Sequence, residues 1–497
     1  MRPVPASVLP DAFLSARPGL VLACLWVLLL PLLSGCGALL HRTAGFTPAT
    51  ADCQALYERV DDPAVKGLAE TERDSPCWLR AREERRHYDS FFIEFDDQGW
   101  IRDSARPRAA SEPAGDFLDR FFAQLDEIHR AQGAGGVSLI VFVHGWHHNA
   151  AAGDDNVVQF RRLLRDLAVA ERQTTPAGEA PMRAVGLYVG WRGQSLDLPY
   201  LEHLSFWERK NTAERVAQGS VRELFSRLDR FHDQHRQPQG GLGAVRMLTV
   251  GHSFGGLITY EALGGEFLRS AVDAGRTGQQ LARMGDLVVL VNPALEGARF
   301  ETLRAAAQRQ SYASGQLPSL IVATSTGDWA TRLAFPAARR LSTLFETTEG
   351  PQSDSIVRTV GHNPRYITHR LDVCGSAALG CERRCDPAAV GSPQAAAPGR
   401  GVGAEGTAQA QLAAEVERAL SLDLVPLARQ ADADALSLAG GLALCRNEAW
   451  QPAYNPFWVV QTSPAVISDH NDIFNPHFTS FIRQIYTAVR DQAAKAK

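Results

Sequence analysis

Short apolar runs alternate with amphipathic segments along most of the chain. Each run holds six or seven residues rich in Val, Ile, Leu and Phe, which is typical of strands buried on both faces of a parallel sheet. Strands are expected at residues 90–95, 137–143, 184–190, 245–250, 286–291, 319–324 and 457–462. Helices are expected at residues 116–131, 157–169, 206–231 (one long helix or two), 257–269, 295–308 and 476–497. This alternation predicts an α/β fold with a mostly parallel central sheet and helices on both faces.

Two regions lack this alternation. Residues 36–87 are expected to form an N-terminal extension or tether, with helical segments at 51–60 and 64–72. An insertion spans about residues 373–450, just before the last expected strand. Its residues 386–412 consist mainly of Ala, Gly, Pro and Ser and contain almost no large apolar side chain. Because such a composition cannot join a core, we expect an exposed loop there.

The strand expected at residues 245–250 runs into a tight turn around one serine. Residues 251–255 are Gly-His-Ser-Phe-Gly, and a helix-compatible segment follows at once. A G-x-S-x-G pattern between a strand and a helix is typical of a nucleophile elbow, where the serine backbone is strained and its hydroxyl is exposed. Gly251 and Gly255 lack the Cβ atoms that would clash in such a turn. Outside that context the pattern fits an ordinary glycine-rich loop, so the flanking elements favour Ser253 as a nucleophile.

A serine hydroxyl is a weak nucleophile at neutral pH, so it needs a base and an acid that orients the base. In this strand–turn–helix context the acid follows the serine along the chain, and the histidine follows the acid. Asp328 is the candidate acid because it stands in a short loop after the strand expected at residues 319–324. The alternative is that Asp328 only caps the next helix. Asp354 and Asp372 have no clear strand before them.

His470 is the candidate base. It lies beyond the last expected strand, in the turn-forming cluster Asp469-His470-Asn471-Asp472. His477 is the rival, but the preceding Asn475-Pro476 predicts a helix start that places His477 in the first turn. The loop position therefore favours His470.

The strand expected at residues 137–143 ends in His-Gly-Trp, at the sheet edge where open α/β sheets bind ligands. The backbone N–H groups of Phe254 and Trp146 are therefore the candidates for stabilising an oxyanion. The alternative is a metal site, for which the nearby ligands are His144, His147, His148, Asp154 and Asp155. A metal site would leave the serine turn unexplained, so we favour the oxyanion loop.

Four short motifs together resemble those of α/β-hydrolases of the lipase and esterase kind. They are Val-Phe-Val-His-Gly-Trp at 141–146, Gly-Trp-Arg-Gly at 190–193, Gly-His-Ser-Phe-Gly-Gly at 251–256 and His-Asn-Asp at 470–472. The resemblance covers about residues 88–372 and 452–490, without the extension and the insertion. It implies an α/β-hydrolase fold and a serine hydrolase that cleaves carboxylic esters through an acyl-enzyme. Ser253 would attack, His470 would transfer the proton and Asp328 would orient His470, with no metal or organic cofactor.

The first residues have the pattern of an export signal. A segment with two arginines leads into an apolar run at residues 20–33, which is short for a membrane-spanning helix. The run ends in Leu33-Ser34-Gly35-Cys36, which resembles the lipobox of bacterial lipoproteins. The resemblance implies cleavage before Cys36, a diacylglyceryl thioether on its sulfur and membrane attachment. Residue 37 is Gly rather than Asp, so the usual signal for retention in the inner membrane is absent, and the resemblance favours the outer membrane of the cell envelope. The alternative is a plain secretory signal.

The predicted organisation is therefore a signal peptide at residues 1–35, an extension at 36–87 and the α/β domain at 88–497. The formal net charge of −4 offers no sign of a nucleic-acid partner, so the expected partners are an ester substrate, lipid esters included, and the membrane. Thioester cleavage and acyl transfer use the same triad and remain alternatives. A catalytically inactive surface lipoprotein that keeps the fold for binding is another.

Export also changes the interpretation of the eight cysteines. Cys24 leaves with the signal and Cys36 takes the lipid, so six remain, an even number that favours disulfides. We expect one bond between Cys53 and Cys77 and two more among Cys374, Cys381, Cys385 and Cys445. A zinc site built on the last region is the alternative, because Cys381 and Cys385 have a loose ligand spacing.

Overall fold

The computed structural model describes most of the chain outside the predicted signal segment and much of the insertion. The described residues are 41–62, 65, 68–101, 115–193, 206–277, 281, 284–343, 347, 352–374, 379, 435–447 and 452–495. Cys36 and the loop expected at 386–412 lie outside them. No helix in these ranges combines the length and the apolar composition that crossing a bilayer requires.

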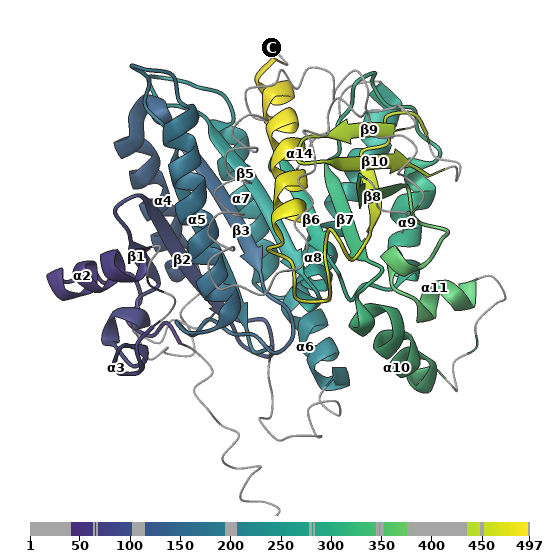
Figure 1. The fold of residues 1–497 in the computed structure, drawn as a ribbon, viewed down its shortest axis with the longest axis horizontal. Coiled ribbons are helices and arrows are strands. Elements are labelled where there is room, and N and C mark those ends of the chain that lie inside the picture. Colours follow the sequence, from purple (N-terminus) through teal and green to yellow (C-terminus); the bar gives the residue numbers. More distant parts are fainter. Residues whose placement is uncertain are drawn as a thin grey trace, which may run out of the picture.

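Eleven strands of the described residues form one sheet, in the order β1-β2-β4-β3-β5-β6-β7-β11-β8-β10-β9 (Figure 1). The seven pairings from β2 to β8 are parallel, whereas β1 pairs antiparallel at one edge and β10 and β9 pair antiparallel at the other. The strands are β1 (Arg82–Glu84), β2 (Tyr88–Phe95), β3 (Val137–Val143), β4 (Arg183–Trp191), β5 (Val245–His252), β6 (Leu287–Val291), β7 (Leu320–Ser325), β8 (His369–Val373), β9 (Ala435–Leu438), β10 (Leu442–Arg446) and β11 (Phe457–Thr462).

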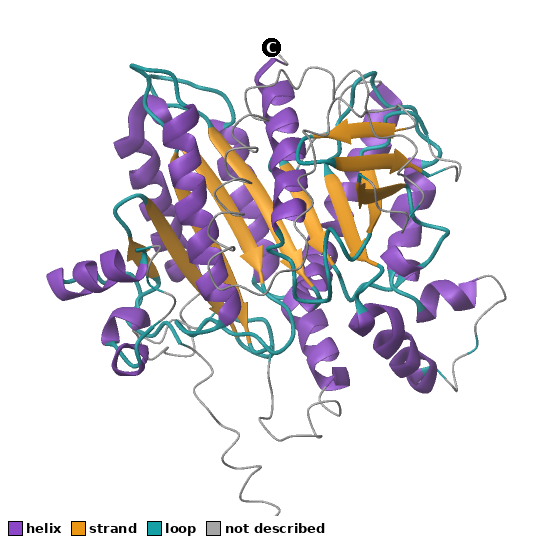
Figure 2. Ribbon diagram, viewed as in Figure 1, coloured by secondary structure: helices purple, strands orange, loops and turns teal. Residues whose placement is uncertain are grey.

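Helices cover both faces of this sheet (Figure 2). Alternate side chains of a strand enter different cores: Val141 of β3 joins one, and its neighbour Phe142 joins the other. The first core is completed by α4 (Gly115–Gln132), α6 (Phe206–Gln218), α7 (Val221–His235), α8 (Phe254–Thr277) and α9 (Gly297–Ala307). The second is completed by α5 (Asp155–Thr174) and α14 (Pro476–Lys495). The prediction of an α/β fold with a mostly parallel sheet is confirmed.

The segment expected at residues 206–231 forms two helices, α6 and α7, which are separated at Gly219. A Cβ atom on Gly219 would lie 2.4 Å from the backbone oxygen of Gly99, so the junction is pressed against the turn that follows β2. In this region a close backbone contact, rather than the hydrophobic period, determines where the helix breaks.

Three predictions in the outer parts of the fold were wrong or incomplete. The helix expected at 64–72 is only α3 (Glu70–Arg73). Asp372, for which the sequence shows no clear preceding strand, lies inside β8. The insertion contributes β9 and β10, two short antiparallel strands that were not predicted. β9 and β10 are only four and five residues long, and Ser437 interrupts the apolar positions of β9, so neither shows the six- or seven-residue run that indicated the central strands.

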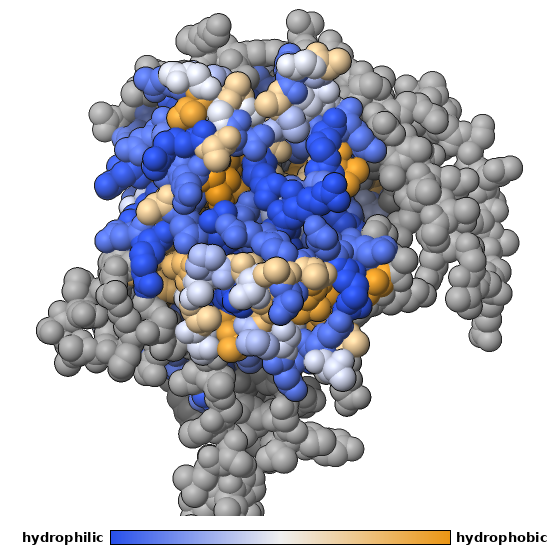
Figure 3. Space-filling view, turned by 90° about the vertical axis from the view of Figure 1, so that its left-hand side faces the viewer, coloured by the Kyte–Doolittle hydropathy of each residue, from blue (hydrophilic) through white to orange (hydrophobic). Residues whose placement is uncertain are grey.

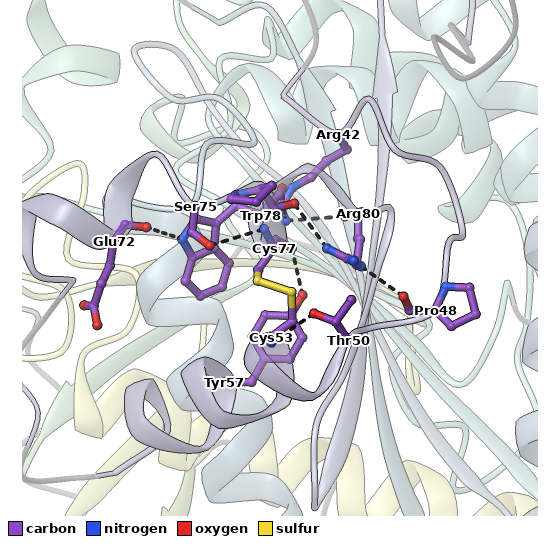
Figure 4. The surroundings of a disulfide bond; sticks show 11 residues. Arg42, Pro48, Thr50, Cys53, Tyr57, Glu72, Ser75, Cys77, Trp78 and Arg80 are labelled. Carbon is purple, nitrogen blue, oxygen red and sulfur yellow. Dashed lines mark hydrogen bonds between the residues drawn. A yellow bond between two sulfur atoms is a disulfide. The ribbon is translucent and has the colours of Figure 1, made fainter.

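The N-terminal extension is held together by a disulfide between Cys53 of α2 (Ala51–Val60) and Cys77, as predicted (Figure 4). The hydroxyl of Tyr57 donates to the Cys77 carbonyl over 2.8 Å, so the ring packs beside the bond. Cys374 and Cys445 of the insertion are also disulfide-bonded, whereas Cys381 and Cys385 lie outside the described residues. Figure 3 shows the side of the molecule that carries the extension, and hydrophilic residues predominate on its surface.

A buried carboxylate fastens the extension to the sheet. Glu83 of β1 is fully buried and accepts from three guanidinium groups, those of Arg42 at 2.7 Å, Arg85 at 2.5 Å and Arg161 of α5 at 2.6 Å. Burial alone would raise the pKa of Glu83, but the three arginines outweigh it and hold the pKa well below its usual value. Removing Glu83 would leave three buried guanidinium groups without their shared carboxylate, so this cluster couples the extension to the α/β domain.

Candidate active site

Ser253 occupies a strained turn between β5 and α8. Its φ of 54° is in the left-handed region, which only a few non-glycine residues of the described chain adopt. Three backbone hydrogen bonds hold it there: its N–H donates to Val291 over 3.0 Å, and its carbonyl accepts from Leu257 at 3.2 Å and from Ala294 at 3.1 Å. The neighbouring structure thus fixes a conformation that is costly for serine.

The glycines of the motif are required by close contacts. A Cβ atom on Gly255 would lie 2.1 Å from the backbone oxygen of Val143, and one on Gly251 would lie 2.7 Å from Thr259 Oγ1. Gly145, on the loop after β3, has the same role from the other side, because its Cβ atom would lie 2.8 Å from that of Ser253. The expected steric reason for the G-x-S-x-G pattern is therefore present.

The structure brings Ser253, His470 and Asp328 together. His470 Nε2 lies 2.9 Å from Ser253 Oγ, and His470 Nδ1 lies 2.9 Å from Asp328 Oδ2. Ser253 follows β5, Asp328 follows β7 and His470 follows β11. The carboxyl ends of these parallel strands lie at one edge of the sheet. Because a carboxylate accepts the Nδ1–H, the lone pair of Nε2 faces the serine hydroxyl, which is the tautomer a base requires.

Asp328 has two structural partners in addition to His470. It is fully buried, and its Oδ1 accepts from the Thr331 backbone N–H over 3.1 Å, while the Thr331 hydroxyl donates to Oδ2. Burial would raise the pKa of Asp328, but the hydrogen bonds from His470 and Thr331 outweigh it and lower the pKa. Asp328 therefore caps the following helical turn and also accepts from His470, and it does both as an ionised carboxylate.

A second histidine lies behind this carboxylate. His362 Nε2 is 3.0 Å from the Thr331 hydroxyl, whose single proton is already donated to Asp328. His362 must therefore donate its Nε2–H, and burial supports a neutral ring by lowering its pKa to about 4. The contacts form one chain that runs from His362 through Thr331 and Asp328 to His470.

The backbone of His470 is held by two buried side chains. The His470 carbonyl accepts from His252 Nε2 at 2.9 Å and from Asn292 Nδ2 at 3.0 Å, and Asn292 Oδ1 in turn accepts from the Ser325 N–H at 2.9 Å. Burial and the neighbouring His470 hold the pKa of His252 well below its usual value, so its ring is a neutral donor. His252 and Asn292 thus fix the loop that presents His470.

His144 organises the loop after β3. Its Nδ1 donates to the Gly145 carbonyl at 2.8 Å, and its Nε2 accepts from the Trp191 backbone N–H at 3.0 Å. The ring stacks on Trp191, at 5.7 Å between centroids and 10° between planes, and burial lowers its pKa to about 4. Because both ring nitrogens have backbone partners, His144 is a loop-fixing residue rather than a metal ligand. Trp191 belongs to the Gly-Trp-Arg-Gly motif at 190–193, and its contacts with His144 give that motif a structural role.

The two residues expected to serve an oxyanion lie next to each other. The rings of Trp146 and Phe254 are 6.4 Å apart between centroids, and Phe254 is the first residue of α8, where helical N–H groups point out of the helix. His148 bonds instead to Asp154 at 3.1 Å, and Asp155 begins α5. Within the described ranges no group of three or more His, Cys, Asp or Glu side chains is arranged to hold a metal ion.

His477 is the second residue of α14, and its N–H donates to the Asn475 side chain over 2.9 Å. The sequence interpretation missed the roles of four residues that support the candidate triad, namely His252, Asn292, Thr331 and His362. Asn292 stands directly after β6 beside the elbow, a position at which a polar residue could have been noticed. No local pattern distinguishes His362 from an ordinary histidine.

Comparison with protein-family models, with curated proteins and with solved structures returns no match for this chain. A function must therefore be argued from the geometry of these residues and from the chemistry that such an arrangement performs.

Proposed function

We propose that this protein is a serine hydrolase with an α/β-hydrolase fold that cleaves carboxylic esters. One observation carries the proposal: Ser253, on a strained strand–turn–helix elbow, is linked through His470 to Asp328 by two contacts of 2.9 Å each. The chain order of serine, acid and histidine is that of α/β-hydrolases. The mostly parallel sheet and the His-Gly-Trp loop beside the elbow also support the assignment.

In the proposed acylation step, Ser253 Oγ attacks the ester carbonyl carbon while its proton passes to His470 Nε2. The carbonyl oxygen becomes an oxyanion, which the backbone N–H groups of Phe254 and Trp146 would stabilise. The C–O bond to the alcohol then breaks, and the imidazolium of His470 gives its proton to the departing alkoxide. Asp328 stays ionised throughout and stabilises the imidazolium.

Deacylation repeats the same steps with water. His470 takes a proton from the attacking water, the new oxyanion collapses, and Ser253 leaves with the proton of the imidazolium. The products are a carboxylic acid and a free enzyme. An alcohol in place of water would give acyl transfer on the same residues.

We further propose that the hydrolase is a lipoprotein of the bacterial cell envelope, anchored through lipid on Cys36. The support is the apolar run that ends in Leu33-Ser34-Gly35-Cys36. Two or three acyl chains at one residue give stable membrane attachment, which one chain alone does not.

Covalent labelling tests the proposed nucleophile. A fluorophosphonate probe is expected to label the native protein at one site, because only an activated serine reacts at neutral pH. Ser253→Ala should abolish labelling, and so should heat denaturation of the native protein. Peptide mass analysis would locate the adduct. If the folded protein takes up no probe, the site is inactive, and the alternative of a binding lipoprotein replaces the hydrolase.

His252 offers a test of how the base is positioned. His252→Ala removes the donor to the His470 carbonyl, and it should lower kcat on a short chromogenic ester about 100-fold with KM nearly unchanged, since small displacements of a catalytic group cost this much. His252→Gln keeps a donor near the position of Nε2 and should recover at least tenfold of that loss. If the folded Gln variant is as slow as the Ala variant, His252 does not act through this hydrogen bond.

A further inference from the structure

We propose that the sheet edge that carries Ser253 lies against the bilayer that holds the Cys36 lipid, and that the enzyme takes its esters from that bilayer. The contact surface rests on the proposed lipid anchor at Cys36, and the substrate part rests in addition on the proposed ester hydrolysis. Three features support it: where the most exposed apolar side chains lie, where the tether joins the fold, and where the active site stands between them.

The four most exposed large hydrophobic side chains in the described part of the chain lie along this edge, one beyond β2 and three beyond β7. They are Trp100, Trp329, Leu333 and Leu341, with exposed fractions of 57%, 61%, 56% and 70%. Trp100 follows the end of β2, where its carbonyl accepts from Asp96 over 2.9 Å. The other three follow β7. Trp329 lies directly before the π-helical turn η4 (Ala330–Ala334), Leu333 lies in η4, and Leu341 lies in α10 (Phe335–Ser342). Three exposed apolar side chains in one short helical segment, with a fourth at the other end of the same sheet edge, are typical of an interaction surface.

The tether joins the fold at the same edge. The backbone N–H groups of His41 and Arg42 donate to Glu94 Oε2 over 2.9 and 2.8 Å, and Glu94 is the residue before the last of β2. Cys36 lies five residues before His41, so a fully extended connection spans at most about 17 Å. The acyl chains on Cys36 therefore hold this end of the sheet edge close to the membrane.

The active site lies between the tether and the apolar helix. The strand order places β5 three strands from β2 and two strands from β7. With strands about 4.8 Å apart, Ser253 is about 14 Å from the tethered strand and about 10 Å from the strand that leads to Trp329. In Figure 1, α10 and the carboxyl ends of the central strands lie at the same side of the molecule. A bilayer that meets both ends of this edge would face Ser253.

Charge near the apolar helix also fits a lipid surface. Two exposed arginines, Arg332 and Arg340, stand beside Leu333 and Leu341. Apolar side chains that enter the acyl boundary with arginines at the level of the phosphates form the usual pattern of an interfacial helix. The other three exposed apolar side chains, Leu79, Val169 and Val272, are at most 40% exposed. Of these, Val169 and Val272 lie far along α5 and α8, helices that begin at the active-site edge and run away from it.

Membrane contact can be measured without any enzyme activity. The full-length lipidated protein is reconstituted in vesicles of phosphatidylethanolamine and phosphatidylglycerol, with and without bromine on the acyl chains. Brominated lipid should quench a substantial part of the tryptophan fluorescence, and the double variant Trp100→Phe, Trp329→Phe should lose more than half of that quenching. Quenching that is absent, or unchanged in the double variant, overturns the proposed surface.

The source of the substrate is tested with a second variant. Leu333→Ser, Leu341→Ser should lower hydrolysis of a long-chain ester embedded in the vesicles at least tenfold, and should leave hydrolysis of a water-soluble short ester within twofold. Val169→Ser, Val272→Ser is the matched control and should change neither rate. If both esters are cleaved at wild-type rates, the enzyme does not draw on the bilayer through this surface. If neither ester is cleaved even by the wild type, ester hydrolysis fails, and the quenching result still decides the contact surface.

Discussion

Replacing His470 by alanine should lower kcat on a short chromogenic ester by about 10⁴-fold or more, because a triad loses its function as a unit. His470 is the residue whose two ring nitrogens face Ser253 Oγ and Asp328 Oδ2 at 2.9 Å. Among the described residues it is the imidazole that contacts Ser253 Oγ, so its removal takes away the group that would accept the serine proton and protonate the departing alcohol. The rate is measured on the full-length protein in detergent, with thermal unfolding as the check on folding.

His477→Ala is the matched control, since it removes the other histidine beyond β11. It should change kcat far less, because His477 belongs to the first turn of α14. The double variant Ser253→Ala, His470→Ala should be hardly slower than either single variant, which is the mark of residues that act together. A near-wild-type rate for His470→Ala, together with an inactive His477→Ala, would move the base to His477 and contradict the proposed triad.

The central sheet and the three residues of the candidate triad could be predicted because each central strand is recognisable from its own short stretch of sequence. The largely apolar runs of β3, β5, β6, β7 and β11 indicate buried parallel strands, and parallel strands bring their carboxyl ends to one edge. Ser253, Asp328 and His470 each follow such a run, so their positions in the chain were enough to expect them near one another. The structure brings them together, while their catalytic roles stay predictions.

The supporting residues could not be predicted for the opposite reason. His362 reaches Asp328 only through the Thr331 hydroxyl, and His252 reaches His470 across 218 residues. These hydrogen bonds form only when η4 and the loop between β11 and α14 have packed and brought the partner side chains within bonding distance. A histidine that is buried as a donor cannot be told from any other histidine by its neighbours in sequence. Asn292 could have been considered, because it stands at the strand end beside the elbow.

The apolar edge was also hidden from the sequence. Trp329, Leu333 and Leu341 fit the pattern of an ordinary helix that packs on a core, and their exposure appears only when η4 and α10 are folded. The sequence predicts a lipid anchor at Cys36 but not its direction, which depends on the hydrogen bonds from the His41 and Arg42 backbone to Glu94 at the carboxyl end of β2. Together these features turn a predicted lipid anchor into a predicted orientation of the whole molecule.

Asp328→Asn should lower kcat by about 10⁴-fold, although it changes the shape of the side chain very little. An amide in place of the carboxylate can donate to His470 Nδ1, which favours the tautomer with its proton on Nε2, the wrong one for accepting the serine proton. It also removes the negative charge that would stabilise the imidazolium. Steady-state rates and fluorophosphonate labelling rates should fall together, because both depend on the same activated serine.

Two controls separate this effect from a general loss of charge or packing. Asp354→Asn neutralises an exposed carboxylate of α11 (Ser353–Val357) and should leave kcat unchanged. Thr331→Val keeps the Asp328 carboxylate but removes the hydroxyl that bonds it, so we expect a loss of about tenfold, equivalent to one hydrogen bond of about 1.4 kcal/mol. A folded Asp328→Asn variant that retains more than a tenth of the wild-type rate would show that His470 is oriented without this carboxylate. The acid of the triad would then have to be sought elsewhere along the carboxyl edge of the sheet.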